Sequence, residues 1–181
     1  MKNTHTTFNR FGFNVTAMLV LTFAMINAQV GSAEEPKQGK KAYAEWVVSY
    51  SDAVKQSEAS GRPIMLVFTG SDWCHWCTKL SDDVFATHEF ARWSTDNVIK
   101  VEVDFPNLYD LPESMASQNE VLKAKYADHV TSYPTVLFVN AGGDVLGTTG
   151  YVAGGPNAWI EDASPMINPE KAKQYLAQSG N

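Results

Sequence analysis

The sequence is poor in cysteine, histidine and basic residues. Its 181 residues include two cysteines and four histidines, and 20 acidic residues outnumber 14 lysines and arginines. The resulting formal charge of −6 disfavours nucleic acid as a partner, because nucleic-acid binders gather positive charge against phosphates. The sequence also lacks a Gly-x-Ser-x-Gly elbow and a phosphate-binding glycine loop, so hydrolases and nucleotide enzymes have no support.

A long uncharged apolar run is missing as well. Residues 15–26 are apolar but interrupted by Thr16 and Thr22, and they fall short of the ~20 residues that a membrane-spanning helix needs. With Lys2 and Arg10 before this stretch and Gly31-Ser32-Ala33 after it, residues 1–33 are predicted to be a signal peptide. A retained membrane anchor is the less favoured alternative. The protein is therefore expected to be periplasmic or secreted.

The mature chain is expected to be one domain. Residues 34–42 are predicted to be a flexible lead-in, and residues 43–181 a domain large enough to form a core without disulfide staples. Removal of residues 1–33 would change the formal charge from −6 to −8. No segment has the pattern of a dimerisation element, so a monomer is expected.

The pattern of apolar residues and breakers predicts alternating helices and strands. Helices are expected at 43–59, from 74 to about 85, at 88–93, 119–127 and 156–166, strands at 64–68, 98–104, 135–139 and 145–149, and a long loop at 105–117. Strands separated by helices are expected to pair in parallel, and the last two strands to form a hairpin. The predicted fold class is α/β, with a central mixed sheet and helices on both faces.

The two cysteines lie together in Cys74-His75-Trp76-Cys77, directly after a buried strand and a turn. A disulfide between them would close too short a loop to stabilise the fold much, so redox chemistry explains the pair better than a structural role. A helix that begins near Cys74 would favour its thiolate, because the free N–H groups and the dipole at a helix start attract an anion.

Two motifs together resemble the thioredoxin superfamily. Asp72-Trp73-Cys74-His75-Trp76-Cys77 follows a strand, and Ser132-Tyr133-Pro134-Thr135 opens another strand about 55 residues later. The resemblance covers about residues 43–166. Within the superfamily the chain looks like the secreted thioredoxin-like proteins and is similar to the C-terminal domain of the bacterial transmembrane disulfide reductant. The resemblance implies a thioredoxin-like fold and a dithiol–disulfide exchange cycle without a bound organic cofactor.

The resemblance implies specific roles for the site residues. Cys74 is expected to attack a substrate disulfide and Cys77, more buried, to resolve the mixed disulfide. His75, if protonated, would favour the thiolate and make the couple more oxidising; a solvent-facing histidine without a role is the alternative. Pro134 matches the family's cis-proline.

The remaining predicted site residues would form the substrate surface. Trp73 and Trp76 are expected at an apolar rim, Trp73 more so than Trp76; core aromatics without a special role are the alternative. The Tyr133 backbone beside Pro134 is expected to pair with an extended substrate strand. Gly150 matches the glycine that borders the family's substrate groove. A trans proline that begins a strand, and a plain turn glycine, are the alternatives at these last two positions.

One position departs from the family. Thioredoxin has a buried Asp six residues before its first cysteine, and this chain has Phe68 there. Asp72, Glu102 or water are the candidates for moving the proton of the resolving thiol, and each acid is alternatively a solvated surface group. The departure puts an efficient thioredoxin-type reductase cycle in doubt.

Two other classes of protein are alternatives. Zinc or copper could use Cys74, His75 and Cys77, but a closed zinc site needs a fourth ligand and His88 and His129 are isolated, so no metal is expected. A thioredoxin-fold binding or chaperone module with an incidental cysteine pair is the second alternative. The favoured function is an exported thiol–disulfide oxidoreductase acting on protein thiols and disulfides, with reduction favoured and a membrane disulfide reductase as the expected electron donor.

Overall fold

The protein is represented by a computed structural model that describes residues 45–168. The predicted signal peptide at 1–33, the lead-in at 34–42 and the end of the predicted domain beyond 168 lie outside these residues. None of the helices between residues 45 and 168 has the length and apolar character that a membrane crossing would require.

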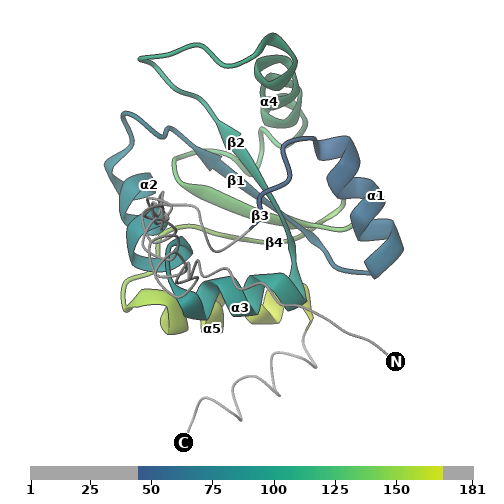
Figure 1. The fold of residues 1–181 in the computed structure, drawn as a ribbon, viewed down its shortest axis with the longest axis vertical. Helices are drawn as coiled ribbons and strands as arrows, with labels where there is room; N and C mark the ends of the chain where they lie inside the picture. The colour runs from purple at the N-terminus through teal and green to yellow at the C-terminus, as the bar shows by residue number, and fades with distance from the viewer. Residues whose placement is uncertain (1–44, 169–181) are drawn as a thin grey trace, which may run out of the picture. The chain divides into compact units, whose positions relative to one another are not determined.

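A four-stranded mixed sheet forms the centre of the described domain (Figure 1). Its strands are β1 (Ile64–Thr69), β2 (Ile99–Asp104), β3 (Thr135–Val139) and β4 (Val145–Thr149), in the order β2-β1-β3-β4. All six residues of β1 are buried, as its continuous apolar run predicts for a strand covered on both faces. The expected mixed sheet is confirmed.

The direction of β3 differs from the prediction. β1 and β2 are parallel, but β3 is antiparallel to β1, although a helix separates β2 from β3. Thr135, the first residue of β3, pairs with Phe68 near the end of β1. The connection through α4 (Glu113–Lys125) therefore starts at the carboxyl end of β2 and returns to the sheet at the carboxyl end of β1. As a result, β3 runs antiparallel to β1.

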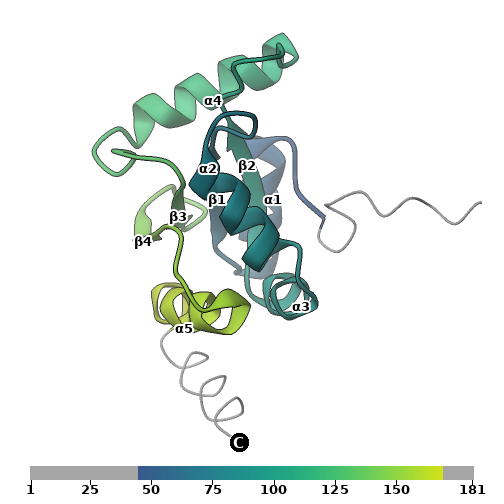
Figure 2. The same ribbon diagram turned by 90° about the vertical axis from the view of Figure 1, so that its left-hand side faces the viewer.

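Helices cover both faces of the sheet, as expected (Figures 1 and 2). α1 (Tyr50–Ser60) and α4 pack on one face, against Ile64, Leu66 and Phe68 of β1. The other face, with Met65 and Val67, is covered by α2 (His75–Leu80), the π-helical turn η1 (Ser81–Phe85), α3 (His88–Asn97) and α5 (Gly155–Ile167). The alternation of side chains along β1 thus supplies two separate cores.

Trp159 of α5 is the centre of the second core. Its ring has edge contacts with those of Phe85, Phe90 and Trp93, at centroid distances of 5.6, 5.6 and 5.7 Å. Its indole N–H donates a 2.9 Å hydrogen bond to the carbonyl of Gly150. Buried aromatic clusters of this kind stabilise a core beyond their buried area, and here the cluster also fixes the chain just after β4.

The first helix begins later than the sequence predicts. The expected helix spans 43–59, but α1 begins at Tyr50, with Ser49 as its N-cap. Val47 lies outside the helix, because its N–H donates a 2.8 Å hydrogen bond to the carbonyl of Lys100 in β2. This tertiary hydrogen bond outweighs the helical spacing of the apolar residues before Tyr50.

Two other boundaries also move. α4 begins at Glu113 instead of residue 119, because the Pro112 carbonyl accepts hydrogen bonds from the N–H groups of Met115 and Ala116 and starts a helix there. The loop after β2 is therefore 105–112 rather than 105–117. α3 extends to Asn97, beyond the expected end at residue 93.

Candidate functional site

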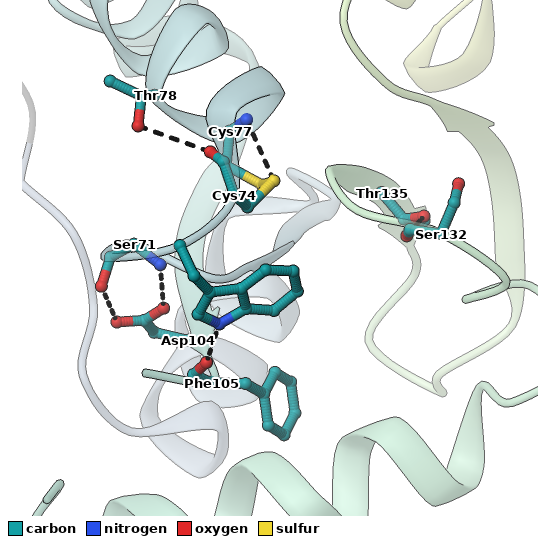
Figure 3. Close-up of a disulfide and its surroundings, with 9 residues drawn as sticks. Ser71, Cys74, Cys77, Thr78, Asp104, Phe105, Ser132 and Thr135 are labelled. Carbon is teal, nitrogen blue, oxygen red and sulfur yellow. Dashed lines mark hydrogen bonds between the residues drawn. A yellow bond between two sulfur atoms is a disulfide. The ribbon is translucent and has the colours of Figure 1, made fainter. Parts of the chain in front are cut away.

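Cys74 and Cys77 form a disulfide at the start of α2 (Figure 3). Cys74 is the N-cap residue of the helix, and its Sγ accepts a 3.2 Å hydrogen bond from the backbone N–H of Cys77. Both cysteines are buried, at 7% and 5% exposure, so Cys77 is only slightly more buried than Cys74. In the reduced state the same N–H would face the Cys74 sulfur, where it would favour a thiolate.

The turn before Cys74 depends on Gly70. Its carbonyl accepts hydrogen bonds from the N–H groups of Trp73, at 3.3 Å, and Cys74, at 2.8 Å. A β-carbon at Gly70 would collide with the indole of Trp73. The absent side chain therefore lets Trp73 fold back over the turn.

Asp104, the last residue of β2, fixes the other side of this turn. Its carboxylate accepts hydrogen bonds from the Ser71 backbone N–H, at 2.8 Å, and from the Ser71 hydroxyl, at 2.6 Å (Figure 3). The hydroxyl of Tyr109 donates a third, at 2.9 Å. Because β1 and β2 are parallel, Asp104 pairs in register with Thr69. It therefore lies at the carboxyl ends of the two strands, on the same side of the sheet as the cysteines.

Asp72 holds the loop that follows β2. Its carboxylate accepts hydrogen bonds from the N–H groups of Asn107, at 2.9 Å, and Leu108, at 2.6 Å. The sequence left Asp72 as a candidate for moving the proton of the resolving thiol. In the structure its carboxylate instead supports the 105–112 loop. Phe68, where thioredoxin has its acid, is fully buried in the core.

Trp73 lies between the disulfide turn and the 105–112 loop. Its indole N–H donates a 2.7 Å hydrogen bond to the Phe105 carbonyl, and its ring contacts that of Tyr133 edge-on at 5.5 Å. Nearly half of the residue, 46%, remains exposed. The structure therefore places Trp73 at the surface beside Cys74, as predicted for a rim residue, and not in the core.

Trp76 is exposed on the other side of the cysteine pair, at 53%. Its ring lies 5.3 Å from the ring of Tyr151 and 5.6 Å from that of His75, which is also exposed. The Tyr151 hydroxyl donates a 2.8 Å hydrogen bond to Asp83, and this bond raises the pKa of Tyr151. Asp83, seven residues after Trp76, thus holds the Tyr151 ring on which Trp76 packs.

Pro134 and Gly150 are brought together. The Tyr133–Pro134 peptide bond is cis, and a β-carbon at Gly150 would lie 3.1 Å from the Pro134 carbonyl oxygen. The Thr135 hydroxyl donates a 2.6 Å hydrogen bond to the Ser132 carbonyl, which closes the loop before β3. Figure 3 shows the Cys74 sulfur pointing toward this loop, labelled at Ser132 and Thr135.

The predicted site residues thus lie around the Cys74–Cys77 disulfide or in the loop that carries Pro134. The sequence did not single out Ser71, Asp104, Tyr109 and Tyr151, which support the turn and the aromatic residues. A usable signal existed for Asp104 alone, because a polar residue at the carboxyl end of a strand parallel to β1 lies at the edge that carries the cysteines. Within residues 45–168 no three His, Cys, Asp or Glu side chains gather as a metal site would require.

Comparison with known proteins identifies relatives of the chain. Residues 50–163 match the family described as a thioredoxin-like domain. The disulfide bond reductase DsbH of Chlamydia pneumoniae is 39% identical over 119 residues, which cover 66% of this chain and 70% of that protein. The thioredoxin-related protein DsbJ of the same organism is 30% identical over 81 residues, 45% of this chain and 23% of DsbJ.

A solved structure agrees with these matches. The structure of a DsbH oxidoreductase aligns with a TM-score of 0.65 and 36% identity, covering 75% of this chain and 94% of that chain. The resemblance inferred from the two motifs, and the thioredoxin-like fold expected from it, are confirmed.

Proposed function

We propose that this chain, which belongs to the thioredoxin-like family and is a thiol–disulfide oxidoreductase, is exported and reduces disulfides in protein substrates. The observation that carries the proposal is the Cys74–Cys77 disulfide at the first turn of α2, flanked by two exposed tryptophans. The reducing direction is supported by the relative named a disulfide bond reductase, and export by the signal-peptide pattern of residues 1–33.

Cys74 carries out the first half of the cycle. In the reduced protein its thiolate attacks one sulfur of the substrate disulfide, so a Cys74–substrate disulfide forms and the other substrate sulfur leaves as a thiolate. The N–H of Cys77, which lies 3.2 Å from Cys74 Sγ in the disulfide form, supports the thiolate before the attack. Cys74 is also the first residue of the pair and the slightly more exposed one.

Cys77 completes the cycle. Its thiol loses a proton and attacks Cys74 Sγ, which restores the Cys74–Cys77 disulfide and releases the second substrate sulfur as a thiolate. Two electrons have then passed to the substrate, and its thiolates take protons from water. The oxidised protein needs a dithiol donor to start again, and a membrane-embedded disulfide reductase is the donor we propose for an exported chain.

The surface around Cys74 suits an extended polypeptide. Trp73 and Trp76 offer apolar contacts on the two sides of the cysteine pair. Across from them, the backbone of Tyr133 next to Pro134 pairs with a substrate strand, and Gly150 leaves room beside the Pro134 carbonyl. These contacts bind main chain and apolar surface, so they fit many substrate sequences.

His75 is proposed to tune the couple. It is exposed between the cysteines and packs its ring on Trp76, so a protonated imidazole would add positive charge beside the Cys74 thiolate. Because Asp72 is engaged by the 105–112 loop, Glu102 and water remain as acceptors for the Cys77 proton, and water is the one we propose.

The reduction potential of the mature domain tests the direction. The domain is equilibrated in defined dithiol–disulfide buffers, and free thiols are trapped by alkylation and counted by mass spectrometry. A value near that of thioredoxin, about −270 mV, is expected, whereas a value near about −120 mV would mean an oxidant. If no reversible two-electron transition were observed, the proposal of an oxidoreductase would be contradicted, and a binding module would be the alternative function.

The proposed electron donor is tested in cells. The chain is expressed with and without residues 1–33, and its thiols are trapped by acid quenching and alkylation. The full chain should be largely reduced in cells with the membrane reductase and fully oxidised in cells without it. An unchanged thiol state in the two strains would contradict the donor, and retention of the full chain in the cytosol would contradict export.

A further inference from the structure

A pocket of about 580 Å³ lies next to the disulfide turn, between the 105–112 loop and α4. It shares Trp73 with the turn that carries Cys74 and Tyr133 with the loop that carries Pro134. Phe105 lies between these rings and α4, with its ring 6.0 Å from that of Tyr133. The volume is within the range of sites that bind small molecules or single side chains.

Two buried polar atoms in the pocket wall have no hydrogen-bond partner among residues 45–168. Asn119 of α4 is 1% exposed, and its amide N–H₂ donates a 2.9 Å hydrogen bond to the Asp104 carbonyl. Its Oδ1 has no hydrogen bond to any residue between 45 and 168, and neither has the buried hydroxyl of Tyr133. Unpaired buried polar atoms are costly, so both atoms favour an occupant that brings hydrogen-bond donors.

The charge at the pocket favours a cation. Asp104, Asp110 and Glu120 line it, against a single Lys123. Neither Asp110 nor Glu120 forms an ion pair with another residue in the described part of the chain. Lys123 lies over the Phe105 ring, with its Nζ 4.7 Å from the ring centroid, so an aromatic face at this pocket already accepts a cation.

We propose that this pocket binds a lysine or arginine side chain of the protein substrate while Cys74 attacks the substrate disulfide. The inference rests on the proposed function and adds a sequence preference to it. The aliphatic stem of the basic residue packs against the aromatic rings, and its N–H groups donate to Asn119 Oδ1 and to the Tyr133 oxygen after these side chains turn toward the pocket, because both atoms are buried in the present conformation. Asp110 and Glu120 supply the charge at the entrance.

The test uses peptides whose single cysteine is joined to thionitrobenzoate. Attack of Cys74 on the peptide sulfur releases the coloured thionitrobenzoate anion, so the rate of mixed-disulfide formation is read directly. One lysine is placed at each of the five positions before and after the cysteine, and each peptide is compared with its norleucine counterpart. The reaction is a single turnover of the reduced protein, and the ratio of the two second-order rate constants cancels differences in the reactivity of the enzyme.

In at least one register the lysine peptide should react about fivefold faster than its norleucine counterpart. In the Asp110→Asn/Glu120→Gln variant this ratio should fall to near 1. The matched control Glu58→Gln/Asp128→Asn removes the same two charges outside the pocket and should keep the native ratio. The preference should also vanish between about 0.01 M and about 1 M salt, as the Debye length falls from about 30 Å to about 3 Å.

A ratio near 1 in every register of the native chain overturns the inference and leaves the proposed function intact, because the peptides still react. An equal loss of preference in the control variant also overturns it, since net charge would then explain the effect. If no peptide releases thionitrobenzoate, the proposed function fails and the inference fails with it.

Discussion

The Asp104 carboxylate accepts hydrogen bonds from both the backbone N–H and the hydroxyl of Ser71. The pair joins the end of β2 to the turn that leads into Cys74. Tyr109 adds its hydroxyl to the same carboxylate, so one buried acid holds the disulfide turn and the 105–112 loop together. The geometry of the redox site therefore depends on a residue 30 positions away in the sequence.

Replacing Asp104 should destabilise the fold and loosen the turn. Asp104→Ala leaves the Ser71 N–H without its acceptor and leaves the Ser71 and Tyr109 hydroxyls only each other, at 2.8 Å, so we expect the free energy of unfolding to fall by about 2–4 kcal/mol. Asp104→Asn keeps one acceptor oxygen and should lose about half as much. Urea denaturation of the oxidised proteins measures both, and a loss below about 0.5 kcal/mol for Asp104→Ala would show that the carboxylate is not needed.

Gly70→Ala should impair substrate reaction through Trp73. The new β-carbon collides with the indole, so the ring must leave its position between the turn and the Phe105 carbonyl. We expect kcat/KM for a peptide disulfide to fall by about tenfold or more, because the apolar contact beside Cys74 is displaced.

Gly142→Ala, in the hairpin turn, is the matched control. Its β-carbon would meet the side chains of Asn140, at 3.3 Å, and Asp144, at 3.7 Å, both in the hairpin turn and far along the chain from the site. It should react like the native protein. Equal kcat/KM values for Gly70→Ala and the native chain would mean that Trp73 does not contribute to substrate binding.

The two cysteine variants should behave differently. Cys77→Ser lacks the resolving thiol, so the mixed disulfide between Cys74 and a protein substrate should accumulate. Cys74→Ser lacks the attacking thiol and should form little adduct, because Cys77 lies inside the first turn of α2 and not at its N-cap, where Cys74 lies. Mass spectrometry after incubation with a disulfide-containing peptide measures both adducts, and equal trapping by both variants would contradict the assigned order of attack.

The elements that the sequence predicted correctly are those determined by neighbouring residues in the chain. The apolar run of β1, the hairpin of β3 and β4 and the Cys74–Cys77 motif were all found where the sequence placed them. The burial of each strand follows from its own residues, and the turn at Asn140 carries its own breakers. These features need no knowledge of distant residues.

The failures share a different cause. The start of α1 is set by a hydrogen bond from Val47 to Lys100, and the role of Asp104 by its register with Thr69. The direction of β3 depends on where the connection through α4 returns to the sheet. Each depends on contacts between segments far apart in the sequence, which periodicity and propensity do not report.

Lys100 gives the stability of the protein a pH dependence. It lies in β2, is 4% exposed and donates a 2.9 Å hydrogen bond to the Ser94 hydroxyl. Burial, with a smaller contribution from Arg62, lowers the pKa of Lys100 to about 8 from 10.5, while Glu45 opposes the shift.

Between about pH 8 and pH 10.5 the unfolded chain therefore holds a proton on Lys100 that the folded chain has released. The unfolded state binds more protons in this window, so the free energy of unfolding should rise with pH, by up to about 3 kcal/mol. Above pH 10 an opposite effect begins, because burial raises the pKa of Tyr50 to about 12 and the folded chain then keeps a proton that the unfolded chain loses.

Lys100→Met separates the two effects. Methionine fills a similar volume without a charge, and Ser94 keeps its own hydrogen bond to the Ala91 carbonyl. We expect the variant to be more stable than the native chain at pH 7, and the difference to shrink between pH 8 and pH 10 as Lys100 loses its proton in the folded native chain. Urea denaturation at intervals of half a pH unit measures this difference. If it stayed constant from pH 7 to pH 10, the buried amine would have an ordinary affinity for its proton, and burial would not be what sets its charge.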